Sequence, residues 1–227
     1  MKVTYIGHSG FLLEWKDCFW LFDYYEGNIP IPSVPKPLYV FSSHSHGDHF
    51  NPAIFSIAGF SKICYILSHD IMKKAKRYET TVNADSIHFM KARQKLLLPV
   101  EGVHKQLEIQ TLPSTDCGVA FLVRYEGKLI YHAGDLNWWV WPGESKQYNN
   151  NMTANFKNYT APLIFLPPFF PWTPVRKTGI TKDSCTFWNR QKTSIMFSLC
   201  TSGRITPLSR NLPVRRKAAH ITGSFSL

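Results

Sequence analysis

Three imidazoles and a carboxylate lie within six residues of the sequence, directly after an apolar stretch. The segment reads His44-Ser45-His46-Gly47-Asp48-His49. Imidazole and carboxylate groups are ligands that a cation such as Zn²⁺ prefers. His44 and His46 are two residues apart, so on an extended backbone both side chains leave the same face. Because Gly47 lets the chain turn, Asp48 and His49 can close around a second point. The spacing therefore indicates two adjacent metal ions.

Three other stretches carry glycine, histidine or aspartate beside apolar residues. They are Gly7-His8-Ser9-Gly10, Leu21-Phe22-Asp23 and Tyr131-His132-Ala133-Gly134-Asp135. Together with the H-x-H-x-D-H segment, their order and spacing resemble the metallo-β-lactamase superfamily, and within it the small bacterial metal-dependent hydrolases. The resemblance covers most of the chain. It implies an α+β fold, a four-layer αββα sandwich with the metal ions at one edge of the sheets.

The resemblance also implies which residues hold two zinc ions. They are His44, His46 and Asp116 for one ion, Asp48 and His49 for the other, and Asp135 between them. Asp116 stands where the family usually has a histidine. A carboxylate can replace imidazole on zinc, although aspartate is also common at turns without any metal. Asp48 is expected to orient the nucleophilic water as well, which makes it the catalytic residue, and His132 to support the site without binding metal.

In this superfamily two zinc ions, about 3.5–4 Å apart, share a water that becomes hydroxide near neutral pH. The hydroxide attacks an ester, phosphoester or amide, and the ions stabilise the developing oxyanion. The resemblance therefore implies a zinc-dependent hydrolase of a small molecule. The substrate is not identified, because loops fix that choice. Trp138, Trp139 and Trp141 follow Asp135 and could either wall a substrate pocket or fill a core.

The hydrophobic pattern predicts many short strands and few helices. Strands are expected at 2–6, 10–15, 18–23, 62–68, 86–91, 95–98, 106–112, 118–125, 128–132 and 161–166. Helices are expected at 51–59, where proline follows a capping asparagine, at 70–78, and, as a poor polar surface helix, at 144–159. Four prolines between residues 28 and 37 predict a loop there.

The composition predicts one large domain in a reducing compartment. A chain of 227 residues is long enough for a sizeable core. Its five cysteines are odd in number and lack C-x-x-C spacing, which favours unpaired thiols and a cytoplasmic protein. We recognise no signal segment, no apolar run long enough to cross a bilayer and no nucleic-acid-binding motif. We therefore expect neither a membrane nor a specific nucleic acid as partner.

The charge of the chain changes near residue 168. Residues 1–168 contain 16 Lys+Arg and 14 Asp+Glu, a net charge of +2, whereas residues 169–227 contain 10 and 1, a net charge of +9. We therefore divide the chain into a metallo-β-lactamase-like domain, 1–168, and a basic tail, 169–227. The tail has no clear helical or alternating pattern, and its charge alone could attract polyanions.

We hypothesise that a frameshift near residues 168–170 produced this tail. Relatives of this type continue with P-L-D-P-R and later with H-V-F-P-M-H-F-W, which contains the last histidine of the second metal ion. With plausible codons, residues 170–176 and 195–203 yield both strings when read from the third base, in one frame. The C-terminal part of the fold is then incomplete, and nothing around His220 resembles the lost motif. The alternative to a hydrolase is therefore a damaged, non-catalytic relative with an incomplete dinuclear site.

Overall fold

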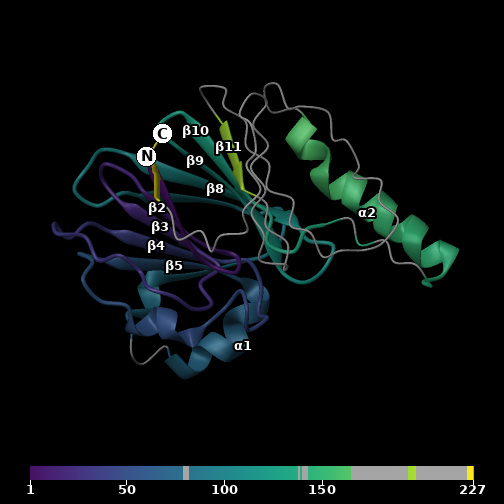
Figure 1. The fold of residues 1–227 in the computed structure, drawn as a ribbon, viewed down its shortest axis with the longest axis horizontal. Coiled ribbons are helices and arrows are strands. Elements are labelled where there is room, and N and C mark those ends of the chain that lie inside the picture. The colour runs from purple at the N-terminus through teal and green to yellow at the C-terminus, as the bar shows by residue number, and fades with distance from the viewer. Residues whose placement is uncertain (79–81, 138, 140–142, 165–193, 198–223, 227) are drawn as a thin grey trace, which may run out of the picture.

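Two β-sheets packed face to face form the centre of the computed structural model (Figure 1). The structure describes residues 1–78, 82–137, 139, 143–164, 194–197 and 224–226. The first sheet has the order β12-β1-β2-β3-β4-β5-β6 and the second the order β11-β10-β9-β8-β7. The strands of the first sheet are β1 (Lys2–Gly7), β2 (Gly10–Glu14), β3 (Phe19–Phe22), β4 (Leu38–Ser42), β5 (Ile63–Ser68), β6 (Ile87–Met90) and β12 (Ser224–Ser226). Those of the second are β7 (Lys95–Pro99), β8 (Gln106–Pro113), β9 (Val119–Tyr125), β10 (Lys128–His132) and β11 (Ser194–Phe197).

The strand directions decide where the loops gather. In the first sheet β1, β2 and β3 pair antiparallel, whereas β3, β4, β5 and β6 pair parallel. The carboxyl ends of the parallel strands therefore share one edge of the sheet. In the second sheet β7 to β10 pair antiparallel, and β11 adds parallel to β10. The loops that follow β3 and β4 thus begin side by side.

Alternating apolar side chains give the sandwich three buried layers. In β9, Phe121 and Val123 join the core between the two sheets, whereas Ala120 and Leu122 face the outside of the second sheet. Such alternation follows from the two-residue period of a strand. The core between the sheets also takes side chains from β2, β3, β4 and β8. A separate cluster covers the outer face of the first sheet. β3 and β4 are therefore buried on both faces, whereas the outer face of β7 and β8 keeps exposed side chains such as Leu97 and Glu108.

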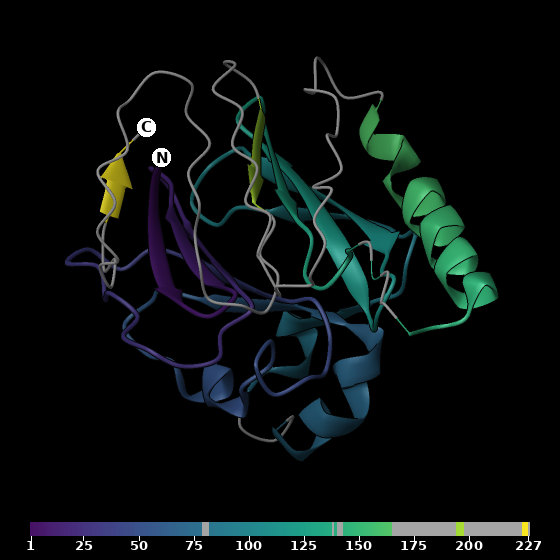
Figure 2. The same ribbon diagram turned by 45° about the vertical axis from the view of Figure 1, so that its right-hand side comes forward.

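Helical segments cover the two outer faces (Figure 2). On the first sheet lie η1 (Pro52–Ser56), η2 (His69–Ile71), α1 (Met72–Ala75) and η3 (Lys76–Tyr78), and η4 (Ala84–Ser86) precedes β6. On the second sheet lies α2 (Lys146–Ile164), whose Phe156 is buried against it. The order of layers is therefore helix, sheet, sheet, helix, as the αββα prediction requires.

Most predicted strands are confirmed, each within one residue at either end, from 2–6 to 128–132. The strand predicted at 161–166 is wrong, because residues 161–164 belong to α2. A short apolar run has no period that separates a strand from a helical turn. The helix predicted at 70–78 is three short segments, of which the central α1 has four residues. The helix predicted at 51–59 is a 3₁₀ segment that ends at Ser56, capped by the Asn51 side chain.

Two short strands fall in the basic tail, where the sequence pattern predicted none. β11 extends the second sheet beside β10, and β12 extends the first sheet beside β1. The rest of residues 169–227 lies outside the described residues, as does the predicted boundary at residue 168. Among the described residues, no helix combines the length and apolar character needed to cross a membrane.

Candidate metal centre

Seven potential metal ligands converge at one edge of the sandwich. They are His8 from the β1–β2 turn, His44, His46, Asp48 and His49 from the segment after β4, Asp116 from the β8–β9 connection, and Asp135 from the segment after β10. They form two groups, in each of which the donor atoms lie within 4.8 Å of one another. All six residues predicted as metal ligands belong to these groups, and His8 is the seventh.

The first group consists of His44, His46, Asp116 and Asp135. His44 Nε2 lies 3.0 Å from His46 Nδ1 and 3.8 Å from Asp135 Oδ2. His46 Nδ1 lies 3.6 Å from Asp116 Oδ2. Two donors bound tetrahedrally to one zinc ion at about 2.0–2.2 Å are roughly 3.3–3.6 Å apart. Small side-chain adjustments would therefore suffice for these donors to hold one cation.

The second group consists of His8, Asp48 and His49. His8 Nε2 lies 3.6 Å from Asp48 Oδ2. His49 Nε2 lies 3.3 Å from Asp135 Oδ1, so Asp135 directs one carboxylate oxygen to His44 and the other to His49. A carboxylate in this position can serve both groups, as the sequence analysis expected of Asp135. Each group combines a buried histidine, His44 in the first and His49 in the second, with a residue that reaches solvent, His46 and Asp48 respectively.

A buried aspartate that the sequence analysis did not single out for a role holds this arrangement. Asp23 Oδ2 accepts hydrogen bonds from His49 Nδ1 at 2.8 Å, His132 Nε2 at 2.7 Å and Ser43 Oγ at 2.7 Å. Its Oδ1 accepts the Ser43 N–H at 2.7 Å. Burial alone would raise the pKa of Asp23, but His132 and His49 outweigh it and hold the pKa well below its usual value. Asp23 is therefore an anion that orients its neighbours. Its sequence signals were its place after four apolar residues and in the stretch Leu21-Phe22-Asp23, which resembles the superfamily without indicating a role for the carboxylate.

The hydrogen bonds to Ser43 and Asp23 decide which histidine nitrogens face the two groups. His49 Nδ1 donates to Asp23, which directs Nε2 towards Asp135. Ser43 Oγ donates to Asp23 and can accept from His44 Nδ1 at 3.0 Å, so His44 Nε2 is left as the coordinating atom. This tautomer assignment follows from the network. A carboxylate or hydroxyl behind a histidine is the usual way that proteins orient a metal-binding imidazole.

The buried donors have shifted pKa values. Burial lowers the pKa of His44 to about 4, so this imidazole is neutral and its Nε2 can bind a cation at pH 7. Burial also lowers the pKa of His49, but the hydrogen bond and charge of Asp23 outweigh it and raise that pKa to about 9. Burial raises the pKa of Asp135 to about 6. Because metal ligands must be deprotonated, a cation that binds His49 must displace a proton.

Two buried atoms of the site have no hydrogen-bond partner among the described residues. They are His49 Nε2 and Asp135 Oδ1, which face one another at 3.3 Å. Buried polar atoms without partners are rare and costly, by about 1–3 kcal/mol each. A nitrogen and a carboxylate oxygen directed to the same point are the donors that a divalent cation uses, so the residues present fit a metal ion.

Two glycines bring the ligand-bearing segments close together. Gly118 has a φ of +67°, and a Cβ added to it would lie 2.1 Å from the Ser43 carbonyl oxygen. Gly134 has a φ of +53°, and its added Cβ would lie 2.6 Å from Ser43 Oγ. Val119, which follows Gly118, donates its N–H to the Ser43 carbonyl oxygen at 2.9 Å. Both sheets therefore meet at Ser43, directly before the first histidine.

The segment after β5 fixes the loop that carries His44 and His46. Asp70 Oδ2 accepts the Ser45 N–H at 2.9 Å, and Lys74 Nζ donates to the Ser45 carbonyl oxygen at 2.5 Å. Both backbone polar groups of Ser45 are thus held from η2 and α1. This pair of contacts was also not predicted from the sequence, because the residues are 25 and 29 positions apart from Ser45.

The remaining residues named in the sequence analysis have simpler positions. His132 contacts Asp23 and so supports the site, as expected. Trp139 donates its indole N–H to the Asp135 carbonyl oxygen at 3.1 Å, whereas Trp138 and Trp141 lie outside the described residues. Asp116 fits both interpretations given above, a turn residue and a metal ligand. Its N–H donates to Ser114 Oγ in a turn, and its carboxylate lies 3.6 Å from His46 Nδ1.

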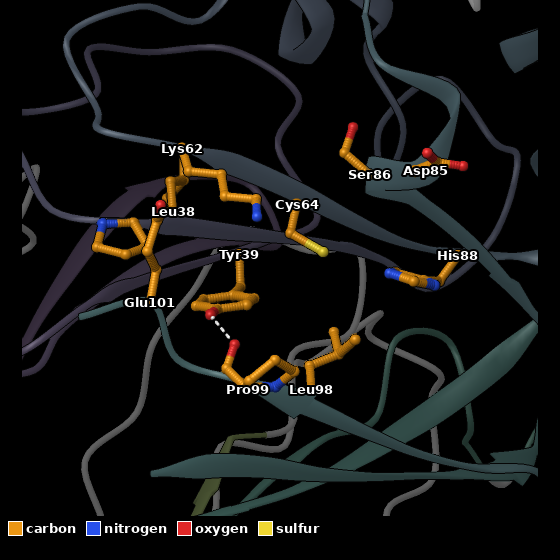
Figure 3. A pocket seen from close by; sticks show the side chains of 11 residues that line it. Leu38, Tyr39, Lys62, Cys64, Asp85, Ser86, His88, Leu98, Pro99 and Glu101 are labelled. Atoms are coloured by element: carbon orange, nitrogen blue, oxygen red, sulfur yellow. Dashed lines mark hydrogen bonds between the residues drawn. The ribbon is translucent and has the colours of Figure 1, made fainter. Parts of the chain in front are cut away.

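A cavity lies at the opposite edge of the first sheet (Figure 3). It has a volume of about 200 Å³ and is lined by residues that include Leu38 and Lys62, at the amino ends of β4 and β5. Tyr39 donates its hydroxyl to the Pro99 oxygen across it at 2.9 Å. Burial raises the pKa of Cys64 to about 11, so this thiol is protonated. The cavity shares no residue with the metal centre.

The comparison with protein families decides the relationship. The model of a beta-lactamase superfamily domain matches residues 2–147 of the 227, more than half of the chain. The chain belongs to this superfamily. Its two-sheet sandwich with helical outer layers is the metallo-β-lactamase fold that the sequence predicted.

Curated relatives agree with this assignment. The chain is 24% identical over 144 residues to a UPF0173 metal-dependent hydrolase of Archaeoglobus fulgidus, covering 60% of this chain and 62% of that protein. It is 31% identical over 143 residues to one of Opitutus terrae, covering 60% and 63%. The matches thus span less than two thirds of these relatives' length. Among solved structures it is similar to Igni18, a metallo hydrolase from Ignicoccus hospitalis, with a TM-score of 0.43 and 22% identity over 61% and 62% of the two chains.

Replacing Asp23 by Asn should weaken both folding and metal binding. The substitution removes the buried charge that His49 and His132 share, so we expect a loss of about 3–5 kcal/mol in the free energy of unfolding. Zinc affinity should fall about 10–100-fold, as for other orienting partners. Urea denaturation and competition with a chromophoric chelator measure the two effects. Glu108→Gln, which alters an exposed pair with Arg124, is the control and should change neither by much. Unchanged zinc affinity in Asp23→Asn would contradict the orienting role.

Replacing Gly118 by Ala should be poorly tolerated. A methyl group at this left-handed position meets the Ser43 oxygen and the His44 Cβ, and the backbone strain alone costs about 1–3 kcal/mol. We expect a lower thermal midpoint together with weaker zinc binding, since His44 must shift. Gly127→Ala is a matched control, because it has a φ of +71° but nothing within 4 Å of its added Cβ. Equal effects of the two variants would show that contact with Ser43 is unimportant.

Proposed function

We propose that this chain is a zinc-dependent hydrolase that acts on an ester, phosphoester or amide bond of a small molecule, in the cytoplasm. The observation that carries the proposal is the position of Asp135, with one oxygen near His44 and the other near His49. A shared carboxylate between two groups of nitrogen and oxygen donors is suited to a pair of divalent ions. The metal-dependent hydrolases among its relatives support the same reading.

We assign the ligands as the sequence analysis predicted. His44, His46 and Asp116 would hold one ion, Asp48 and His49 the other, and Asp135 both. The donor set favours zinc, which takes imidazole and carboxylate ligands in tetrahedral sites. The unpartnered His49 Nε2 and Asp135 Oδ1 support it as well, since a cation would satisfy both. When bound, the ions would supply Lewis acidity and a nucleophile derived from water.

The chain's own residues would organise the remaining chemistry. Like Asp116, which has 35% of its side chain exposed, Asp48 has 38% exposed and can reach a substrate and its attacking water. It would accept a hydrogen bond from that water and so orient it. Asp23 keeps the His49 ring fixed while the substrate enters. The nearby Trp139 indole, bonded to the Asp135 oxygen, would stiffen the segment that carries Asp135.

Metal content and hydrolysis together test the proposal. Zinc per chain is measured by elemental mass spectrometry, and turnover with a p-nitrophenyl ester, a bis-p-nitrophenyl phosphodiester and a lactone. We expect turnover that a chelator abolishes and added zinc restores. Asp48→Asn should lower kcat about 100-fold or more, as removal of a proton-handling group does. His104→Ala, at an exposed histidine outside both groups, is the control. Turnover that survives metal removal would refute the assignment, and turnover absent at one ion or fewer per chain would favour the damaged, non-catalytic relative.

We also propose that residues 169–227 are an out-of-frame tail that follows a domain of residues 1–168. The family model matches only as far as residue 147, and the net charge rises from +2 to +9 between the two parts. Both observations support a change of reading frame near residues 168–170. The two short strands β11 and β12 are the parts of the tail that the structure describes.

The nucleotide sequence across codons 168–170 tests the frameshift. We expect independent clones or closely related strains to carry one length change at this point and to encode both P-L-D-P-R and H-V-F-P-M-H-F-W downstream. If they instead encode residues 169–227 as printed here, the tail is native. The excess of ten basic residues over one acidic residue in the tail would then be a property of the native protein.

A further inference from the structure

We propose that His8 is a ligand of the second metal ion, where it serves as the fourth donor beside Asp48, His49 and Asp135. This inference rests on the proposed metal site but adds a residue to which neither the sequence analysis nor the relatives give a role. It starts from the composition of the second group, which among the described residues consists of His8, Asp48 and His49.

The number of donors is the first argument. Asp48 and His49 provide two donors, and Asp135 Oδ1, which lies 3.3 Å from His49 Nε2, provides a third. Protein-bound zinc is almost always four-coordinate at structural sites, and catalytic sites combine three or more protein ligands with a water. His8 Nε2 lies 3.6 Å from Asp48 Oδ2, close to the roughly 3.3–3.6 Å that separates two donors on one tetrahedral zinc ion. It therefore completes the set without a large movement.

The environment of the His8 ring directs the correct nitrogen into the group. Its Nδ1 lies 3.1 Å from the hydroxyl oxygen of Ser9, whose side chain is buried. That contact leaves Nε2 facing Asp48. The ring also makes edge-to-face contacts with His49, at 5.7 Å between ring centroids, and with Tyr25, at 5.9 Å. A partner behind one nitrogen and rings on two sides are how proteins fix a metal-binding imidazole.

The backbone at His8 is the second, independent argument. His8 has a φ of +49°, in the left-handed region that non-glycine residues rarely adopt. It lies in a tight turn between Gly7 and Gly10, which pair across the β1–β2 hairpin. Asparagine or glycine would suit such a turn better than histidine. Strained residues of this kind cluster where a side chain has a function. The two-residue turn thus carries His8 on a rigid pair of strands, with its Nε2 3.6 Å from Asp48 Oδ2.

Two substitutions separate a ligand from a structural residue. His8→Asn retains a residue that tolerates the left-handed backbone but removes the imidazole, and His8→Ala removes every donor. The control is His104→Ala. Each full-length protein is stripped of metal, checked by circular dichroism and titrated with Zn²⁺ by calorimetry. A parallel titration follows the visible absorption of bound Co²⁺, which reports coordination number and does not depend on turnover.

We expect the wild type and His104→Ala to bind two equivalents. Both His8 variants should bind the first equivalent unchanged and the second at least about tenfold more weakly, the low end of what even an orienting partner contributes. The Co²⁺ spectrum of the second equivalent should shift accordingly. If His8→Asn is folded and binds two equivalents with wild-type affinity and spectrum, His8 is no ligand. A folded wild type that binds only one equivalent overturns the inference too, because His8 then does not complete the second position.

The outcomes for the two proposals are distinguishable. A wild type that binds two ions but hydrolyses nothing would remove the proposed activity and leave the ligand assignment intact. Hydrolysis that needs zinc, combined with His8 variants that bind both ions normally, would do the reverse. If neither His8 variant folds, ¹⁵N-histidine spectra of the wild type decide the matter, since a ligating His8 Nε2 must shift on addition of the second equivalent and an unshifted one refutes the proposal.

Discussion

The metal centre depends on one buried anion. Asp23 accepts four hydrogen bonds from three residues: Ser43 and His49, which follow β4, and His132, which ends β10. A carboxylate removed from water is unfavourable unless it is paired, and these donors provide the pairing. Because His132 comes from the second sheet, the same carboxylate joins the two halves of the sandwich. The same hydrogen bonds that pair the buried Asp23 carboxylate therefore also orient His49 and, through Ser43, His44.

The fold brings this about through the ends of its strands. β3 ends at Phe22, directly before Asp23, and its parallel neighbour β4 ends at Ser42, directly before Ser43, so the two loops begin beside one another. β8 and β10 deliver Asp116 and Asp135 from the opposing sheet. The core between the sheets and the apolar cluster outside the first sheet hold these strand ends in place. The ligands themselves can then be polar and partly exposed without loosening the site.

The sequence was sufficient to predict most strands and to name the residues that gather at one edge of the sandwich, because both leave local patterns. Alternating apolar residues define a strand, and histidines two apart after such a strand define a ligand pair. It was insufficient where the deciding contact is distant. Nothing near Asp23 in the sequence indicates that His132 contacts it, and nothing near Asp70 indicates that it holds the Ser45 N–H. The failed strand at 161–166 has another cause, since a four-residue apolar run fits a helix equally well.

The contact between Gly118 and Ser43 has a mechanical consequence. Gly118 in the β8–β9 connection packs against the Ser43 carbonyl oxygen with no room for a methyl group, and the Val119 N–H donates to the same oxygen. The two sheets consequently cannot slide past one another without pulling Asp116 away from His46. A shift of one sheet against the other would therefore change the distance between Asp116 and His46. The distances between the candidate ligands therefore depend on how the two sheets are aligned, as the packing of the core between the sheets does.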